Sequence, residues 1–191
     1  AYNFWYNNQF SEAERAFAGL FKELDKPAYQ HHKLRRHLET LRRQHEGVGR
    51  LTALLEAYKD NATRLSTLAD SETMLWLLVS LNAMQARFAR GDAGNYTAAG
   101  LLCYRALEVA SQHRLALRGF DSLNPDYSTL GLTLEELEDR YQSAWQRVAT
   151  KKQAETPRAF PSEGEPVPLF EGYLLLSALD DELTQRPIHS K

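Results

Sequence analysis

The sequence lacks the features of several protein classes. It contains a single cysteine, Cys103, so no disulfide can form within the chain, and this predicts a reducing, cytoplasmic setting. Because Cys103 lies in an apolar run, we expect a buried small side chain rather than a reactive thiol. No apolar run approaches the ~20 residues of a membrane span, since the longest, Met74–Leu81, contains Ser80. We therefore expect no membrane partner.

A strong charge of one sign is also missing. Lys and Arg together number 23 and Asp and Glu 25, which gives a formal net charge of -2. Bulk charge therefore indicates neither a nucleic acid nor a membrane surface as partner. Hydrophobic residues make up 43% and charged residues 25%, which is ordinary for a globular protein with a core. A length of 191 residues allows one domain or two small ones.

Strand-like alternation is absent, whereas apolar residues recur at helical spacing along most of the chain. The pattern predicts a helix ending at Tyr6 and further helices over about 10–24, 28–46, 48–69, 72–90, 95–118, 134–150 and 169–183. The turns between them are mostly short, so neighbouring helices should pack antiparallel. The predicted fold class is therefore all-α, an antiparallel helical bundle.

Local signals set the expected helix ends. Ser11 with Glu14, and Thr133 with Glu136, have the spacing of capping boxes. Glycines at positions 47 and 49, and again at 91 and 94, are expected to end helices. The helix over 95–118 is apolar on most sides, which is typical of a central helix. The tail from Arg186 is expected to fray.

Two short stretches share a pattern of a small turn, an aromatic residue and an alanine three positions later. They are Asn8-Gln9-Phe10-x-x-Ala13 and Gly94-Asn95-Tyr96-x-x-Ala99. Tetratricopeptide hairpins have this pattern, but the two copies are too far apart for an array with a period of ~34 residues. We therefore predict isolated tetratricopeptide-like hairpins.

The most basic stretch, residues 31–50, is a candidate RNA-contacting segment. Several of its arginines have glutamates one helical turn away: Arg35 and Arg43 flank Glu39, and Arg42 precedes Glu46. The cations without such a neighbour are the candidate RNA-binding residues: Lys33, Arg36 and Arg50. The alternative is a solvated helix face, which is favoured because no aromatic residue is interleaved for base stacking.

Metal and cofactor chemistry finds no support in the motifs. The four histidines of this stretch, His31, His32, His37 and His45, show no i, i+3 or i, i+4 pair, so we expect no metal site. There is also no glycine-rich phosphate loop and no Gly-x-Ser-x-Gly motif, and we expect no cofactor.

Arg105 and Glu108 lie three residues apart in the most apolar predicted helix. A charge there must be paired or reach the surface. We interpret the two residues as a structural ion pair. The alternative is a buried polar group near an active centre.

The block GDAGNYTAAGLLCYRALEVASQHRLALRGF, residues 91–120, carries a family resemblance. Its turn, Tyr96, Ala99 and the Tyr104–Glu108 run are similar to a segment of CRISPR-associated proteins from type III systems. In that family a CARF sensor is joined through helices to a HEPN ribonuclease. The N-terminal Phe4-x-x-Asn7-x-x-Phe10-x-x-Ala13 block resembles the point where that family leaves its sensor.

The resemblance implies a CRISPR accessory protein whose sensor binds cyclic oligoadenylate. Its nuclease would cut single-stranded RNA without metal, as a homodimer. Residues 1–90 would be a helical linker-type subdomain and residues 91–191 a partial HEPN-like helical subdomain. The chain opens at Ala1 with an aromatic helical pattern and no signal peptide, so the sensor is expected upstream.

The sequence departs from the family in its catalytic signature. HEPN nucleases carry an arginine, four to six residues and then a histidine, and none of the six histidines here has that spacing. We therefore assign no catalytic residue and expect these 191 residues to be inactive alone. The alternative function is a non-enzymatic helical adaptor that binds a partner protein, and it predicts an exposed groove near Trp5, Trp76 and Tyr96.

Overall fold

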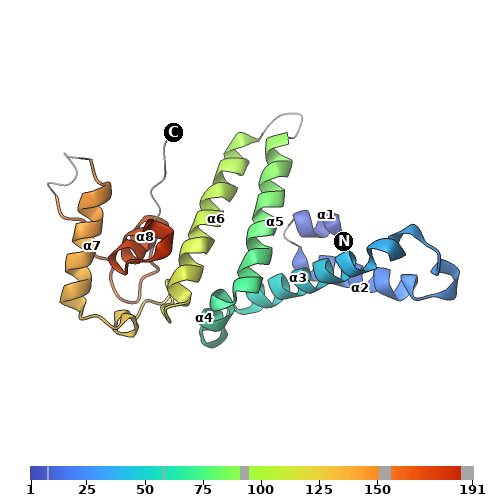
Figure 1. The fold of residues 1–191 in the computed structure, drawn as a ribbon, viewed down its shortest axis with the longest axis horizontal. Coiled ribbons are helices and arrows are strands. Elements are labelled where there is room, and N and C mark those ends of the chain that lie inside the picture. The colour runs from blue at the N-terminus through green and yellow to red at the C-terminus, as the bar shows by residue number, and fades with distance from the viewer. Residues whose placement is uncertain (8, 58, 91–94, 151–155, 186–191) are drawn as a thin grey trace. The chain divides into compact units, whose positions relative to one another are not determined.

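The computed structural model describes residues 1–7, 9–57, 59–90, 95–150 and 156–185 (Figure 1). Within these ranges the chain contains helices and loops and no strand, so the all-α prediction is confirmed. None of the helices in these ranges combines the length and hydrophobicity that crossing a bilayer requires. The chain divides into two compact units, Ala1–Ala106 and Leu107–Lys191, which are described separately.

The helices follow one another along the chain with short connections. The α-helices are α1 (Tyr2–Tyr6), α2 (Phe10–Leu24), α3 (Leu38–Ala57), α4 (Asn61–Ala69), α5 (Ser71–Arg90), α6 (Tyr96–Ala116), α7 (Leu134–Val148), α8 (Leu169–Ala178) and α9 (Glu182–Gln185). Short 3-10 helices are η1 (Pro27–Tyr29), η2 (Lys33–His37) and η3 (Tyr127–Leu130). The boundary between the two units falls inside α6.

The first unit is organised around α3. This helix packs against α2 and α5, while α1 covers both α2 and α5. Phe17, Val48 and Leu51 are fully buried at the centre. The Trp5 indole NH donates a hydrogen bond to the Ser80 hydroxyl at 2.6 Å, which satisfies the polar edge of a buried ring.

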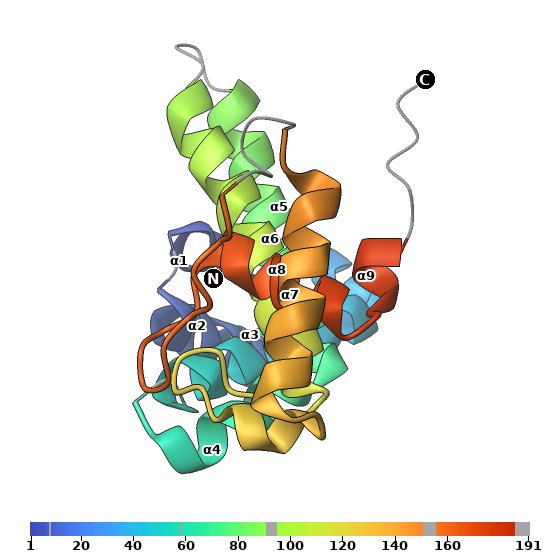
Figure 2. The ribbon, with the colours of Figure 1, turned by 90° about the vertical axis from the view of Figure 1, so that its left-hand side faces the viewer.

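The second unit is organised around α8. Three consecutive leucines of α8, Leu174–Leu176, are fully buried, so this helix lies at the centre of the unit. α7 packs alongside it (Figure 2) and contributes the fully buried Tyr141. Phe160, from the proline-rich loop before α8, lies against Tyr141 with ring centroids 5.2 Å apart. Hydrophobic packing therefore fixes both α7 and this loop onto α8.

The predicted helix ends at Gly47 and Gly49 are wrong. α3 continues through both glycines to Ala57, and the region expected to begin a helix at residue 28 instead contains η1 and η2. Gly47 is buried beneath the ring of Trp76, which occupies the space that a Cβ atom would need. Close packing against α5, rather than a helix end, therefore explains this glycine.

The two expected capping boxes have different outcomes. At Thr133 the box is confirmed, because the Thr133 hydroxyl accepts from the Glu136 amide and the Glu136 carboxylate accepts from the Thr133 amide. At Ser11 it is wrong, because α2 begins earlier, with Gln9 as its N-cap and no side-chain cap bond. Ser11 is thus already inside the first turn.

Replacing Thr133 by alanine is expected to destabilise the second unit by about 1 kcal/mol, the usual effect of losing an N-cap side chain. Thr133→Ser retains the hydroxyl and should behave like the unmodified protein. Urea titration followed by circular dichroism compares the two. Equal stability of the two variants would show that the capping box does not contribute.

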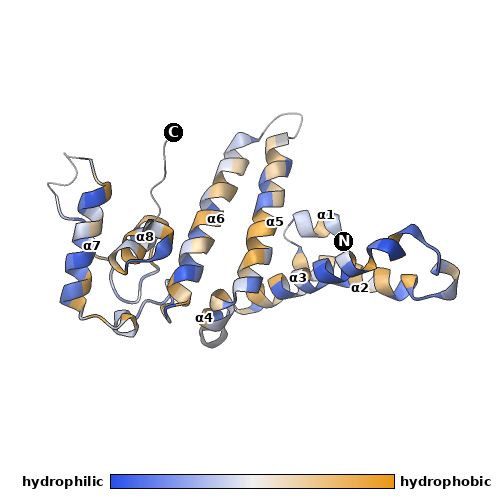
Figure 3. Cartoon of the chain, viewed as in Figure 1, coloured by the Kyte–Doolittle hydropathy of each residue, from blue (hydrophilic) through white to orange (hydrophobic). Residues whose placement is uncertain are grey.

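The expectation that the helix over 95–118 is central is also wrong for most of α6. Leu101, Tyr104 and Leu107 are 65%, 53% and 63% exposed. Cys103, expected to be buried, is exposed as well, and its sulfur accepts a hydrogen bond from the Gln85 side chain. Figure 3 shows hydrophobic and hydrophilic residues interspersed along α6. The apolar content of a helix does not by itself say how much of it is covered.

The tetratricopeptide-like character of the hairpins is not confirmed. Ala13 and Ala99 are both buried, but the preceding aromatic residues differ, because Phe10 is buried and Tyr96 is 75% exposed. The two stretches therefore do not share one packing arrangement. The expected helix ends at glycines 91 and 94, and the expected fraying from Arg186, lie outside the described residues.

The last predicted helix, over 169–183, is broken. α8 ends at Ala178, Asp180 has a left-handed backbone with φ +53°, and α9 starts at Glu182. The carboxylate of Asp181 then accepts a hydrogen bond from the Leu183 amide at 3.1 Å, at the start of α9. The chain therefore turns sharply at Asp180 and begins a new helix.

Candidate functional site

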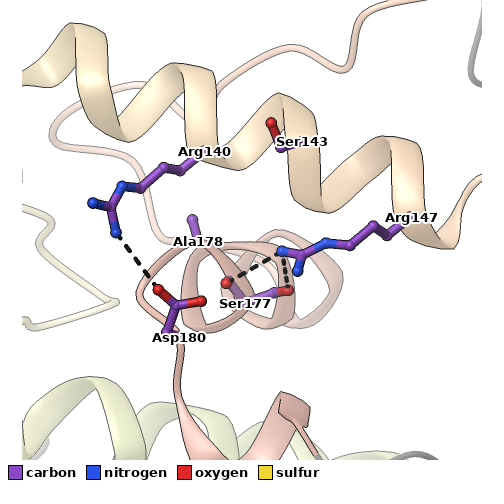
Figure 4. A pocket seen from close by; sticks show the side chains of 6 residues that line it. All are labelled: Arg140, Ser143, Arg147, Ser177, Ala178 and Asp180. Atoms are coloured by element: carbon purple, nitrogen blue, oxygen red, sulfur yellow. Dashed lines mark hydrogen bonds and ion pairs between the residues drawn. The ribbon is translucent and has the colours of Figure 1, made fainter.

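A polar pocket lies between α7 and the C-terminal end of α8 in the second unit (Figure 4). Its cavity volume of about 440 Å³ lies within the range of sites that bind small molecules. We call it the α7–α8 pocket, and it is lined by Arg140, Ser143, Arg147, Ser177, Ala178 and Asp180.

The sequence of α7 places three of these residues on one face. Arg140, Ser143 and Arg147 have i, i+3, i+7 spacing, which is one stripe of an α-helix. Tyr141 and Ala144, on the neighbouring face, are fully buried against the core. The buried stripe therefore holds the polar stripe in place over the end of α8.

Arg147 donates hydrogen bonds to the C-terminal end of α8. Its Nη2 atom donates to the Ser177 hydroxyl at 3.1 Å and to the Ser177 carbonyl at 3.5 Å. The last carbonyls of a helix lack partners within it and carry partial negative charge, so a guanidinium at this place is favourable. Arg140 faces Asp180 on the other side of the pocket, with Nη1 and Oδ2 3.6 Å apart.

A buried ion cluster stabilises the turn next to the pocket. Asp181 is 1% exposed and accepts hydrogen bonds from Arg114 at 2.9 and 3.0 Å, and longer ones from Arg118. Burial alone would raise the pKa of Asp181, but the hydrogen bonds and charge of Arg114, with the Leu183 amide and Arg118, place it below the ordinary value of 3.8. This carboxylate is ionised and joins the end of α6 to the α8–α9 turn.

The structure separates the three candidate RNA-binding residues. Lys33 and Arg36 lie exposed on η2. Arg50, on α3, has three acidic partners: Glu72 at 2.6 Å, Asp70 at 2.9 Å and Glu46 at 3.7 Å. The premise that Arg50 lacks a partner is therefore wrong, and this residue ties α3 to the start of α5. RNA binding by the three residues stays a prediction.

The local ion pairs expected in the same stretch are partly present. Glu39 pairs with Arg43 at 2.7 Å as expected, whereas Arg35 donates to the Leu24 carbonyl instead. His45 packs against the ring of Phe21, with centroids 5.5 Å apart, so it flanks the core. Among the residues with described positions, no group of three histidines, cysteines or carboxylates is placed to hold a metal ion.

Arg105 and Glu108 both lie on α6. Arg105 is exposed and Glu108 half-buried, so neither charge is enclosed in the core. Both residues have interaction partners in the structure. Their pairing with each other stays a prediction.

Sequence reasoning missed the arginine-lined pocket. The i, i+3, i+7 spacing of its α7 residues was visible, but it resembles any solvated helix face. The residues that complete the pocket, Ser177 and Asp180, are about 30 positions away and meet α7 only because α8 ends there. The break after Ala178, which creates this end, has no glycine or proline to mark it.

The fold and the site define an all-α protein whose C-terminal unit carries an arginine-lined pocket beside a buried ion cluster. The family model described as the Csm6 HEPN domain matches residues 68–191, about two thirds of the chain. The chain therefore belongs to the Csm6 HEPN domain family, which confirms the resemblance to CRISPR-associated HEPN proteins. No curated protein matches the chain significantly. The matched region contains the whole second unit and hence the α7–α8 pocket.

Proposed function

We propose that this chain is the helical portion of a CRISPR-associated RNA endonuclease that cyclic oligoadenylate regulates, and that these 191 residues do not cleave RNA alone. The observation that supports the proposal is the match to the Csm6 HEPN domain over residues 68–191. In this reading residues 1–90 form a linker-type subdomain and residues 91–191 a partial HEPN-like subdomain. RNA is the substrate and a homodimer the working unit.

The absence of activity follows from the missing catalytic pair. Metal-independent cleavage of RNA needs a histidine for proton transfer and a cation to steady the phosphate, close enough to act on one linkage. The Arg-x4-6-His spacing does not occur in the sequence. On α6, Arg105 and His113 have seven residues between them and lie ~12 Å apart along the axis at ~1.5 Å per residue, so they do not reproduce the arginine–histidine pair of the family.

One observation favours the alternative of a non-enzymatic adaptor. Tyr96, Leu101, Tyr104 and Leu107 are large exposed residues of α6 and offer an apolar surface for another chain. The groove expected near the two tryptophans is not supported, because Trp5 is buried and Trp76 covers Gly47. The same α6 surface also suits the homodimer of the leading proposal.

The complete gene product tests the proposal. We expect it to cleave single-stranded RNA in the presence of EDTA, with a rate that cyclic oligoadenylate raises by about tenfold or more. The 191-residue chain, assayed in parallel, should show no cleavage. A complete gene product that neither binds cyclic oligoadenylate nor cleaves RNA would overturn the proposal and favour the adaptor function instead. Cleavage by the 191-residue chain alone would refute the proposal that these residues are inactive alone.

A further inference from the structure

We propose that the α7–α8 pocket binds the phosphate backbone of a single RNA strand. The inference rests on the proposed function for the choice of RNA as ligand. Its structural basis is the convergence of Arg140, Arg147 and the Ser177 hydroxyl on one pocket.

The spacing of the two arginines suits a chain of phosphates. Arg140 and Arg147 are seven residues apart on α7, about 10 Å along the axis, and they lie at opposite ends of the pocket (Figure 4). A guanidinium presents five N–H donors in a planar fork that matches phosphate oxygens. The two side chains can therefore hold two phosphates of one strand, or one phosphate between them.

Most of this donor capacity is not used within the described part of the chain. The two hydrogen bonds of Arg147 both come from Nη2 and both go to Ser177. That leaves Nε and Nη1 for a ligand while the contact to α8 keeps the side chain in place. The Ser177 hydroxyl accepts from Arg147, so its own hydrogen can be donated to a phosphate oxygen.

The acidic residue in the pocket competes only weakly with a phosphate. Arg140 and Asp180 are separated by 3.6 Å, and their side chains are 51% and 70% exposed. An ion pair this exposed is well solvated and contributes little. A phosphate can therefore replace Asp180 as the partner of Arg140.

The surroundings keep the pocket rigid without adding negative charge inside it. Asp181, a buried acid beside the pocket, is neutralised by Arg114 and Arg118 and is 1% exposed. Tyr141 and Ala144 fix α7 against the core. Among the residues that line the pocket, Arg140 and Arg147 carry the positive charge and Asp180 the negative one. Glu136, one helical turn before Arg140 on α7, also interacts with the Arg140 charge from outside the lining.

Binding of a fluorescent single-stranded RNA to the 191-residue chain, followed by anisotropy, tests the site. The variant Arg140→Gln/Arg147→Gln should bind about tenfold more weakly at low salt. Each phosphate contact in a single strand contributes about 0.7 to the slope of log K against log salt, so losing two should flatten the slope by about 1.4. The Arg140→Lys/Arg147→Lys variant keeps the charges and should retain most of that slope.

The matched control removes the same charge from a helix with no assigned binding role. Arg15→Gln/Lys22→Gln on α2 also loses two exposed cations seven residues apart and should change RNA affinity less than twofold. A pocket variant that binds like the unmodified chain overturns the inference, as does a control variant that loses as much affinity. Circular dichroism melting checks that each variant is folded, and Ser177→Ala gives a milder variant with an expected two- to threefold loss.

Competition experiments separate the kinds of anion. Inorganic phosphate should displace RNA only at millimolar concentration, because it replaces one of several backbone contacts. Displacement by polyglutamate at the same charge concentration as RNA would assign the pocket to an acidic protein and overturn the inference. If the complete gene product cleaves RNA but the pocket variant binds RNA like the unmodified chain, this site is refuted and the proposed function stands. If the pocket variant loses RNA affinity but the complete gene product does not cleave RNA, the site is supported and the proposed function is refuted.

Discussion

Replacement of Asp181 by alanine is expected to lower the free energy of unfolding of the second unit by about 3 kcal/mol. Breaking a buried ion pair by removing one partner typically costs about 3–5 kcal/mol, because the other charge stays without compensation. The side chains of Arg114 and Arg118 are 32% and 38% exposed, which permits some rehydration and sets the expectation at the lower end. Asp181→Ala also removes the acceptor for the Leu183 amide at the start of α9.

The neighbouring residue provides the control. Asp180→Asn removes one negative charge from an exposed position, and asparagine tolerates the left-handed backbone found there. Its effect on urea unfolding should stay within about 0.5 kcal/mol. If Asp181→Ala were no more destabilising than Asp180→Asn, the buried cluster would not hold the α8–α9 turn.

The same carboxylate makes stability depend on acidity. The pKa of Asp181 is lower in the folded protein than its ordinary value of 3.8, so the unfolded chain takes up the proton first. The stabilisation is fully present above about pH 4 and is lost as the pH falls from 3.8 through the lower folded pKa. The unmodified protein should therefore lose stability more steeply than Asp181→Asn over that range. Parallel slopes would contradict the assignment.

Helical periodicity predicted the fold class and the places of α2, α5, α7 and the start of α8, because those stripes face a core. The periodicity gave wrong predictions where a residue packs against one that is far away in the sequence. Gly47 has the local signature of a helix end, but its reason is Trp76, which lies 29 positions later in α5. The exposure of Leu101, Tyr104 and Leu107 could not be predicted either, since an apolar helix looks the same whether or not it is covered.

The candidate site was less predictable than the fold. The basic stretch 31–50 stood out by composition, yet Arg50 turned out to be paired with residues of the α4–α5 connection and α5. The α7–α8 pocket depends on where α8 ends, and that end is fixed by Asp181 meeting Arg114. Long-range ion pairs of this kind leave no periodic signal, so only the folded arrangement shows which arginines are engaged and which line a pocket.

The packing of Gly47 leads to the second large expected effect. An added Cβ atom would come closer than 3.0 Å to the Trp76 ring, which real Cβ atoms essentially never do, so the ring or α3 must shift. Overpacking of this kind typically costs about 1–3 kcal/mol, while replacing a helical glycine by alanine gains up to about 1 kcal/mol. We expect Gly47→Ala to destabilise the first unit by about 1–2 kcal/mol and Gly47→Leu to prevent its folding.

Gly49, two residues further along the same helix, is the matched control. A Cβ atom there would meet only the Glu14 carboxylate at 3.5 Å, an ordinary contact, so Gly49→Ala should stabilise the unit by up to about 1 kcal/mol. Opposite signs for the two alanine variants in thermal unfolding would attribute the effect to Trp76 rather than to helix propensity. Combining Gly47→Ala with Trp76→Leu should then cost less than the two changes summed, because the smaller side chain leaves room for the Cβ. Additive effects would mean that the ring does not resist the new methyl group.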